Sequence, residues 1–389
     1  MNPLTRRVHQ SLHVRVIHGT YAKGRYYMGA LHTPAEQSAF NPTGTEGFAF
    51  VEFTSAQPDL LNTLLKKLGF SAVSKHTNKP LTWYQQGNIY FLVNDHPYGF
   101  TANFEQCHGP SACAMGFCVK DASQAYQYAI SHGAQQCLPR SLEFQVPAIY
   151  GIGDSVLYLV DSNNNPATDS KHFKKLSASS EFTNIPAVGL LDIDHLTHNV
   201  FQGKMNNWAG FYQDIFNFHE IRYFDIKGKH TGLLSRAMTS PCGKIKIPIN
   251  EATDDQSQIE EYLRDYNGEG IQHIALTTND IIDTVKQLKS NGIEFMAVPD
   301  SYYDMIEKRL PGHQQDIDQL REHSILIDGH KENGRWKILL QIFTTTVIGP
   351  IFFEIIQRLG DEGFGEGNFQ ALFEAMESDQ IRRGIIKPE

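Results

Sequence analysis

The chain has 389 residues, a length typical of about two or three domains. Hydrophobic residues make up 41% of it and charged residues 20%, which is the composition of a folded globular protein. Its 34 basic and 43 acidic side chains give a formal net charge of −9, so the chain has no general attraction to nucleic acid or anionic lipid. No apolar run approaches the ~20 residues that cross a bilayer. We therefore expect neither a nucleic-acid nor a membrane partner.

The first 40 residues differ in composition from the rest, with five Lys and Arg side chains and no acid before Glu36. They contain no apolar stretch typical of a secretory signal, although an Arg-rich and acid-poor start is also typical of organelle transit peptides. We favour a disordered extension over residues 1–40.

Short strands alternate with single helices in the first half of the remaining chain. A helix over residues 59–69 carries leucines spaced three or four residues apart and ends at Gly69. The other expected elements, in chain order, are strands over 47–53, 82–85, 88–94 and 111–119, a helix over 121–132 and a strand near 155–160. We assign residues 41–165 to one domain.

A polar, irregular stretch over residues 166–188 is expected to link this domain to a second one over 189–389. The second domain repeats the alternation. Its expected elements, in chain order, are a strand from 190, a helix over 205–216, strands over 232–238, 245–249 and 270–277, a helix over 280–290, and strands over 324–328, 338–344 and 351–357.

Two of these units align without gaps. Asp121 matches Asp280 and Gly133 matches Gly292, and both pairs are 159 residues apart. The apolar positions between them coincide at the spacing of one buried helix face. We therefore expect four units of one strand, one helix and further strands, two units to each half.

These units predict an α+β protein of two domains, each made of paired βαβββ units that form a curved, open, barrel-like sheet around a cavity. The glycine-rich stretch 363–369 leads to a helix that we expect to cap the cavity. A phosphate-binding loop is not favoured there, because the stretch has no lysine. The five cysteines form no Cys-x-x-Cys pair and are odd in number, which favours a reducing compartment and a cytoplasmic protein.

The repeat and the apolar pattern of the last strand single out three candidate metal ligands. His273 lies on the first strand of the fourth unit, where the second unit has Ala114. His195 lies on the first strand of the third unit; His198, three residues on, must face the other side of the strand. Glu354 interrupts an apolar run, and a buried acid is costly unless it is paired or binds a cation.

His195, His273 and Glu354 together match the 2-His-1-carboxylate set of mononuclear non-haem Fe(II) oxygenases. A salt bridge from Glu354 to Arg358 and ordinarily packed histidines remain open at this point.

Several motifs make the chain resemble the 4-hydroxyphenylpyruvate dioxygenase family over residues 41 to about 380. They are Asn41-Pro-Thr-Gly-Thr45, His108-Gly-Pro-Ser-Ala-Cys-Ala114, Asp194-His195, the run 268–276, Phe352-Phe-Glu-Ile-Ile-Gln-Arg358 and the loop 363–369. The resemblance implies one Fe(II) per chain, bound by His195, His273 and Glu354 in the C-terminal domain, with a metal-free N-terminal domain. It implies that 4-hydroxyphenylpyruvate, an α-keto acid, and O₂ give homogentisate and CO₂ in tyrosine and phenylalanine catabolism, in a homo-oligomer (dimer or tetramer).

The resemblance also implies a substrate pocket. Its expected residues are Ser235, Pro248, Asn250, Gln258, Gln272, Gln341, Phe343, Phe364, Asn368, Phe369 and Leu372. Among them the three phenylalanines are expected to form aromatic walls, and Asn368 and Leu372 to lie at the lid. We expect Gln272, Gln341 and Asn250 to take part in catalysis.

Three alternatives share parts of this pattern. A 4-hydroxymandelate synthase resembles the family in ligands and substrate, but is expected to carry smaller or aliphatic residues in place of Asn250 and Phe369. An extradiol ring-cleaving dioxygenase shares the units and the three ligands but lacks the loop 363–369. A metal-free binding protein built from the same units would have no use for three intact ligands.

Overall fold

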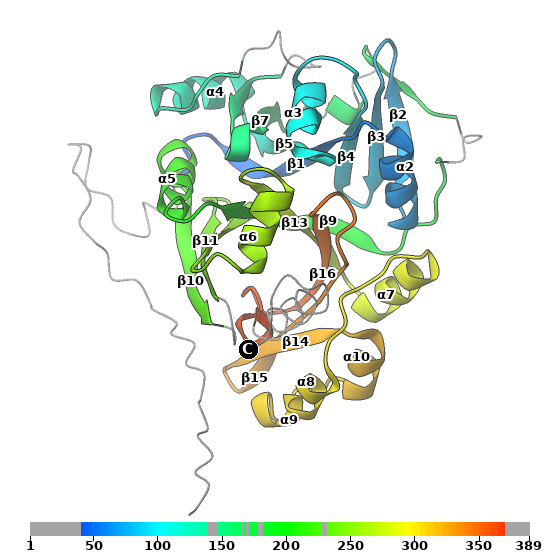
Figure 1. The fold of residues 1–389 in the computed structure, drawn as a ribbon, viewed down its shortest axis with the longest axis vertical. Helices are drawn as coiled ribbons and strands as arrows, with labels where there is room; N and C mark the ends of the chain where they lie inside the picture. The colour runs from blue at the N-terminus through cyan, green and yellow to red at the C-terminus, as the bar shows by residue number, and fades with distance from the viewer. Residues whose placement is uncertain are drawn as a thin grey trace, which may run out of the picture.

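The computed structural model describes residues 40–137, 146–164, 166–168, 171–177, 182–227 and 232–369. Within these residues the chain forms two eight-stranded mixed sheets, one from each half, with the N-terminal half uppermost in Figure 1. The expected N-terminal extension up to residue 39, the capping helix beyond residue 369 and Leu372 lie outside the described residues.

The N-terminal sheet has the strand order β6-β7-β5-β1-β4-β3-β2-β8. The elements of this half are β1 (Thr45–Thr54), α2 (Pro58–Lys67), β2 (Ser71–His76), β3 (Leu81–Gln86), β4 (Ile89–Asn94), α3 (Phe100–His108), β5 (Ser111–Val119), α4 (Ala122–Ser131), β6 (Ala148–Tyr150), η2 (Ile152–Asp154), β7 (Val156–Asp161), η3 (Pro166–Thr168) and β8 (Phe173–Lys175).

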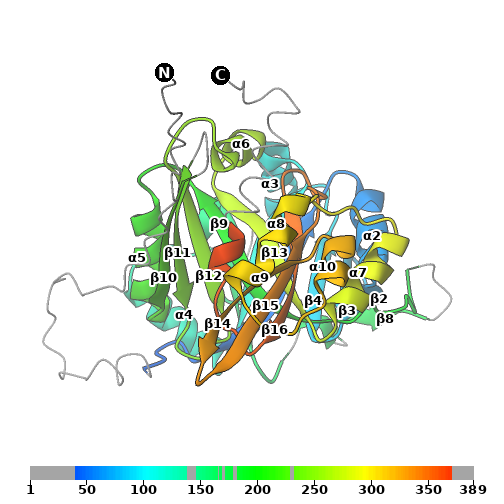
Figure 2. The ribbon, with the colours of Figure 1, turned by 90° about the horizontal axis from the view of Figure 1, so that it is seen from below.

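The C-terminal sheet has the strand order β10-β11-β12-β9-β13-β16-β15-β14. The elements of this half are β9 (Leu190–Val200), α5 (Met205–Phe216), β10 (His219–Lys227), β11 (Gly232–Thr239), β12 (Lys246–Ala252), α6 (Gln258–Asp265), β13 (Gly270–Thr278), α7 (Ile281–Ser290), α8 (Asp300–Asp304), α9 (Ile306–Arg309), α10 (Ile317–His323), β14 (Leu326–Glu332), β15 (Arg335–Phe343) and β16 (Phe352–Leu359). This sheet curls into a half-barrel, seen from below in Figure 2.

The two halves repeat one plan. β5 pairs antiparallel with β1 and parallel with β7, and β13 pairs in the same way with β9 and β16. The helices that follow β5 and β13 begin alike, because the side chains of Asp121 and Asp280 each accept a hydrogen bond from the backbone NH three residues on. The expected α+β architecture of paired units is therefore correct.

The halves share one hydrophobic core. Phe91 of β4 packs 6.1 Å from Phe353 of β16, and Phe117 of β5 packs 5.3 Å from Phe216 at the end of α5, ring centre to ring centre. This packing gives the C-terminal sheet a rigid outer support, so its concave face can carry polar side chains.

Some elements were not expected from the sequence. β2, α3, β6, β10, α6 and α8 to α10 were absent from the sequence prediction. The stretch expected to be a linker also contributes a strand, because β8 pairs with β2 at the edge of the N-terminal sheet. In the part of the chain that the structure describes, no helix is both long and apolar enough to cross a membrane. Cys107, Cys113, Cys118 and Cys242 are free thiols.

Candidate active site

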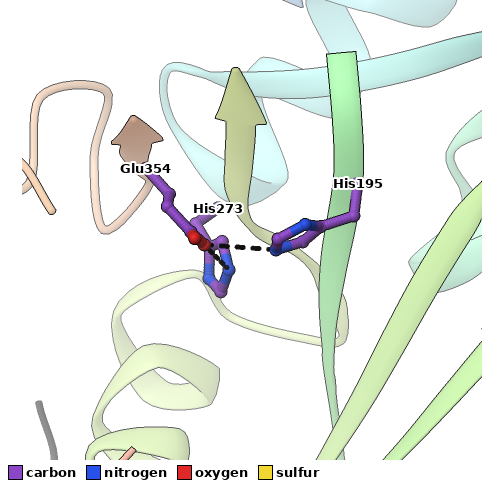
Figure 3. Close-up of side chains that lie close together, drawn as sticks. All are labelled: His195, His273 and Glu354. Atoms are coloured by element: carbon purple, nitrogen blue, oxygen red, sulfur yellow. Dashed lines mark ion pairs between the residues drawn. The ribbon is translucent and has the colours of Figure 1, made fainter. Parts of the chain in front are cut away.

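The three candidate metal ligands lie on adjacent strands of the C-terminal sheet. In the pairing register, Ala275 of β13 stands between His195 of β9 and Glu354 of β16. His273 precedes Ala275 by two residues, so its side chain points to the same face. Figure 3 shows the three side chains converging from their strands.

The ligand atoms are close enough to share one ion. Oε2 of Glu354 lies 3.2 Å from Nε2 of His195 and 3.5 Å from Nε2 of His273. All three side chains are buried, and their ligand atoms lie within 4.8 Å of one another. Among the described residues this is the one group of three or more His, Cys, Asp and Glu side chains that could hold a metal ion.

His198 faces away from this group. Its Nε2 lies 2.7 Å from the hydroxyl of Tyr212 on α5, on the other side of β9. Burial lowers the pKa of His198 to about 3, so this imidazole is neutral. The prediction that only one of the two histidines on this strand points into the site is confirmed.

Each metal-facing histidine is held by its neighbour in sequence. Nδ1 of His195 lies 2.8 Å from Oδ1 of Asp194, and Nδ1 of His273 lies 3.0 Å from Oε1 of Gln272. With Nδ1 donating, Nε2 of both rings is free to bind a metal, which is the usual outer-shell arrangement of metal sites.

Arg358 binds Asp194 and not Glu354. Its Nε and Nη2 donate to the two carboxylate oxygens of Asp194 at 2.7 and 2.8 Å. The alternative of a Glu354–Arg358 salt bridge is therefore wrong. Arg358 also donates from Nη1 to the backbone oxygens of Asp361 and Gly363, and so connects the candidate metal ligands to the chain that follows β16.

The electrostatics of the site favour a bound cation. Burial opposes ionisation of Glu354, but the charges and hydrogen bonds of His195 and His273 outweigh it and lower its pKa to about 2. Burial likewise opposes ionisation of Asp194, but Arg358 and His195 hold its pKa well below the usual range. Asp194 is paired with Arg358 and lies 3.9 Å from Nζ of Lys246, whereas the groups of possible positive charge beside Glu354 are the two imidazoles. Burial opposes protonation of His195, but Glu354 and Asp194 outweigh it and raise the pKa of this imidazole. A bound divalent metal would take the place of that proton, and two imidazoles with one carboxylate fit a metal of the Fe(II) type.

Several residues expected in the pocket surround this centre. Gln341 donates from Nε2 to Oε1 of Glu354 at 2.8 Å, and Asn368 donates from Nδ2 to Oε1 of Gln341 at 2.8 Å. Phe364 lies edge-on to His195 at 5.4 Å, and Phe343 lies edge-on to His273 at 6.2 Å.

The remaining pocket candidates lie on β11, β12 and α6, except Phe369, which follows β16. Ser235 and Asn250 face each other across β11 and β12, and both are at least half-buried. Gln258 opens α6 and is buried, and within the described residues its Oε1 accepts no hydrogen bond. Pro248 is buried on β12, and Phe369 packs against Phe224 of β10 at 5.0 Å.

Sequence reasoning missed the roles of Asp194 and Arg358, which lie 164 residues apart and carry no local pattern that would pair them. It also missed Tyr302 and Arg309, which contact Asn368 and Gly367. Their helices, α8 and α9, are too short for a helical period to reveal them.

Comparisons with known proteins agree with this geometry. Residues 40–174 match the family model of the N-terminal region of hydroxyphenylpyruvate dioxygenase. Residues 192–305 match that of the glyoxalase/bleomycin resistance protein/dioxygenase superfamily. A 4-hydroxyphenylpyruvate dioxygenase of Pseudomonas aeruginosa is 53% identical over 92% of this chain and 100% of its own length. The chain belongs to the 4-hydroxyphenylpyruvate dioxygenase family.

Two further relatives of this family member differ in name. The hemolysin VllY of Vibrio vulnificus is 54% identical over 90% of this chain and 98% of its own length. The solved structure of a triple mutant of 4-hydroxymandelate synthase from Streptomyces coelicolor is 25% identical, with a TM-score of 0.74 over 87% of this chain and 99% of that one. The 4-hydroxyphenylpyruvate dioxygenase family thus shares its fold with a synthase that was one of the alternatives.

Proposed function

We propose that this dioxygenase uses one Fe(II) per chain, held by His195, His273 and Glu354, to convert 4-hydroxyphenylpyruvate and O₂ into homogentisate and CO₂. The reaction is a step in the breakdown of tyrosine and phenylalanine. The observation that carries the proposal is the buried Glu354 carboxylate, which faces two imidazoles at 3.2 and 3.5 Å. The nearby Arg358 does not neutralise it, because Arg358 binds Asp194. The chain that carries this site is also 53% identical to a protein named 4-hydroxyphenylpyruvate dioxygenase.

The three ligands leave room for the substrate. A bound Fe(II) would supply open positions for the keto and carboxylate oxygens of the substrate and for O₂, together with the electrons that activate O₂. Phe343 and Phe364, which flank the two histidines, hold the aromatic ring and keep water out. Gln272 and Gln341 contact His273 and Glu354, so their part in catalysis is to hold these side chains in place.

The phenol end of the substrate contacts the polar side chains on β11, β12 and α6. The unpartnered Oε1 of buried Gln258 supports a hydrogen bond to the phenol hydroxyl, because an unsatisfied buried acceptor is costly. Ser235 and Asn250 contribute further hydrogen bonds, and Pro248 shapes the wall beside them. Phe369 belongs with Phe343 and Phe364 to the aromatic walls, and Asn368 and Leu372 lie at the lid.

The runner-up is hydroxylation of the benzylic carbon, as in a 4-hydroxymandelate synthase. Asn250 and Phe369 are both present, whereas smaller or aliphatic residues are expected there in such a synthase. The identities of 53% to a dioxygenase and 25% to the solved synthase favour the dioxygenase reaction.

The deciding experiment uses protein reconstituted with Fe(II) and ascorbate and given 4-hydroxyphenylpyruvate under air. Products are identified by mass spectrometry, and O₂ uptake is recorded alongside. We expect homogentisate and CO₂, with O₂ and substrate consumed in equal amounts. Formation of 4-hydroxymandelate would contradict the assignment of Asn250 and Phe369. A ring-cleaved product, or no turnover with iron bound, would contradict the reaction itself.

We also propose that residues 41–165 form a metal-free domain and residues 189–389 the iron domain. The odd number of cysteines and the lack of a Cys-x-x-Cys pair support a reducing compartment, and we place the protein in the cytoplasm. We further propose a homo-oligomer, a dimer or tetramer. Size-exclusion chromatography with light scattering measures the mass of the protein in solution, and the mass of a monomer would contradict the proposed oligomer.

A further inference from the structure

The lid segment, which we define as residues 363–369, closes the open side of the half-barrel. Glu366 pairs with Arg222 of β10, at one edge of the sheet, at 3.2 Å. The backbone NH of Gly367 donates to Asp328 of β14, at the other edge, at 2.6 Å. The segment therefore reaches across the curl of the sheet, and any group that fixes it also fixes the access to the site.

One hydroxyl group beside the lid segment has its whole hydrogen-bonding capacity in use. Tyr302 of α8 accepts hydrogen bonds from the backbone NH of Ile327 at 2.8 Å and from Nη2 of Arg309 at 2.9 Å. Its single proton has two acceptors within reach, Oδ1 of Asn368 at 2.6 Å and the backbone oxygen of Ile327 at 2.9 Å. Arg309 already donates to the Ile327 oxygen, which leaves the closer Asn368 oxygen as the acceptor for the proton. Nη2 of Arg309 also donates to Oδ1 of Asn368 at 3.4 Å, so Tyr302 and Arg309 together place donors at the oxygen end of the Asn368 amide.

From Tyr302 the hydrogen bonds run in one direction toward the metal ligands. With its oxygen turned to Tyr302, Asn368 donates from Nδ2 to Oε1 of Gln341. Gln341, with its oxygen so occupied, donates from Nε2 to Oε1 of Glu354. Asn368, Gln341 and Glu354 are all buried, so no water competes along this relay.

The relay selects the carboxylate oxygen that faces the histidines. Oε1 of Glu354 is held by Gln341, and Oε2 is the atom at 3.2 and 3.5 Å from the two imidazoles. A glutamate whose second oxygen is engaged in this way is held for ligation through one oxygen, which leaves other metal positions open.

Arg309 of α9 ties the start of the relay to the lid segment. Its Nη1 donates to the backbone oxygen of Gly367 at 2.9 Å, while its Nη2 serves the hydroxyl of Tyr302 and the backbone oxygen of Ile327. The guanidinium is exposed, yet it is the point where α9, β14 and the lid segment meet.

We propose that Tyr302 and Arg309 are positioning residues for the dioxygenase reaction, which hold the lid segment on β14 and β15 and orient Gln341 and Glu354 through Asn368. The proposal rests on the proposed function for the chemistry that it serves. Its structural part stands on the hydrogen bonds alone.

The sharpest test is Tyr302→Phe, because the chain offers a matched control in the next residue. Tyr303 is buried on the same helix, and within the described residues its hydroxyl has no hydrogen-bond partner. Tyr303→Phe therefore makes the same chemical change without touching the relay. Both variants are compared with the unchanged full-length chain in steady-state kinetics, retention of Fe(II) against a chelator, thermal unfolding and amide hydrogen exchange.

For Tyr302→Phe we expect kcat/KM to fall about 10–100-fold and Fe(II) to be lost more readily. Amide exchange should quicken over residues 363–369 and not across the β-sheets. Tyr303→Phe should match the unchanged protein in kinetics, Fe(II) retention and lid exchange, and it should unfold at the same or a slightly higher temperature, because it removes a buried hydroxyl that has no partner. Equal kinetics, Fe(II) retention and lid exchange for the two variants would overturn the proposal. Faster amide exchange throughout the Tyr302→Phe protein, and not only over residues 363–369, would overturn it too.

A second pair of variants decides the matter if Tyr302→Phe does not fold. Arg309→Lys keeps the charge but cannot serve Gly367 and Tyr302 together, and Arg321→Lys makes the same change at the ion pairs of Arg321 with Asp300 and Asp304. We expect Arg309→Lys alone to quicken exchange in the lid segment and to lower kcat/KM by about tenfold. No difference between the two lysine variants would refute the role of Arg309. If the unchanged protein formed no homogentisate, the proposed function would fail, whereas exchange and Fe(II) retention would still decide this proposal.

Discussion

Ala114 of β5 and His273 of β13 occupy the same position in two copies of one unit. Ala114 pairs with Val156 of β7, and His273 pairs with Phe352 of β16, in the same parallel register. Two residues further on, Gly116 and Ala275 each pair with an antiparallel strand on one side and a parallel strand on the other.

This register also identifies the N-terminal counterparts of the other two ligands. Phe50 stands where His195 does, and Tyr158 stands where Glu354 does. Their rings lie 5.5 Å apart and pack with Trp83 in a small hydrophobic cluster of their own. The N-terminal half therefore fills with aromatic side chains the place where the C-terminal half presents ligands.

We accordingly expect one Fe(II) per chain, and we expect Glu354→Ala to abolish it. Removal of the carboxylate leaves two neutral imidazoles, which cannot offset the dehydration of a dication. Titration of metal-free protein with Fe(II) under argon measures the number of sites, and far-ultraviolet circular dichroism checks that the variant is folded. Turnover should be lost together with the metal. Binding of two ions by the unchanged chain, or full activity of Glu354→Ala, would contradict the assignment.

Arg358→Met should weaken both the metal site and the fold. The change leaves the Asp194 carboxylate buried without its bidentate partner, and a broken buried ion pair costs about 3–5 kcal/mol of unfolding free energy. Since Asp194 orients His195, we also expect Fe(II) affinity to fall about 10–100-fold. Denaturant unfolding and Fe(II) competition measure the two effects.

The matched control for this change is Arg236→Met. Arg236 pairs with Glu220 at 2.8 Å, but both side chains are partly exposed, so we expect a loss of about 1 kcal/mol or less and no change in metal affinity. Similar losses for the two variants would show that burial of the Asp194–Arg358 pair has no special weight.

The sequence was informative where a local pattern repeats. The helices expected over 121–132 and 280–290 exist because each has an Asp cap and one apolar face, and both signals lie within a dozen residues. His273 could be selected as a candidate metal ligand because the repeat marks its position as His in one copy and Ala in the other, and Glu354 because it is an acid within an apolar run. Their convergence depends on the strand order, which no local pattern specifies.

Other features depend on contacts between distant residues. The helices α8 and α9 have five and four residues, which is too short to show a period, yet they supply Tyr302 and Arg309. Gln272 was expected to face the substrate. The pairing of β13 with β9 is irregular between Ile271 and His273, and no local pattern in the sequence predicts this irregularity or the 3.0 Å approach of the Gln272 amide to Nδ1 of His273.

Gly365→Ala should lower activity because there is no room for a side chain. A Cβ atom at this position would lie 1.8 Å from Oε1 of Gln341, and the backbone φ of +76° already disfavours alanine. The added methyl group would push Gln341 off Glu354. We expect kcat/KM to fall at least tenfold, as steady-state kinetics would show, with about 1–2 kcal/mol of stability lost.

Gly203→Ala separates the clash from the backbone strain. Gly203 has a φ of +81°, and no atom lies within 4 Å of its added Cβ. This variant should lose about 1–2 kcal/mol of stability from backbone strain and retain its activity. If both variants lost activity to the same extent, strain and not Gln341 would be the cause.

Asp95→Asn should stabilise the protein at neutral pH, with a gain that disappears in acid. Burial is the main cause that raises the pKa of Asp95 from its usual 3.8 to about 6, which Lys75 partly offsets and Asp59 reinforces. Within the described residues its Oδ1 has no hydrogen-bond partner. Above pH 6 the folded state must therefore carry a poorly solvated charge that the unfolded chain carries at no cost.

The sign follows from proton binding. Between pH 6 and pH 4 the folded state binds more protons at Asp95 than the unfolded state does, so stability rises as the pH falls through this range. Asparagine is neutral throughout and escapes the penalty. We expect the Tm of Asp95→Asn to exceed that of the unchanged protein by about 2–6 °C at pH 8, and the difference to approach zero near pH 4. Calorimetry at pH 8, 7, 6 and 5, with Asp265→Asn at an exposed site as control, measures this trend. A difference in Tm that stayed constant across these pH values would show that the charge of Asp95 is not its cause.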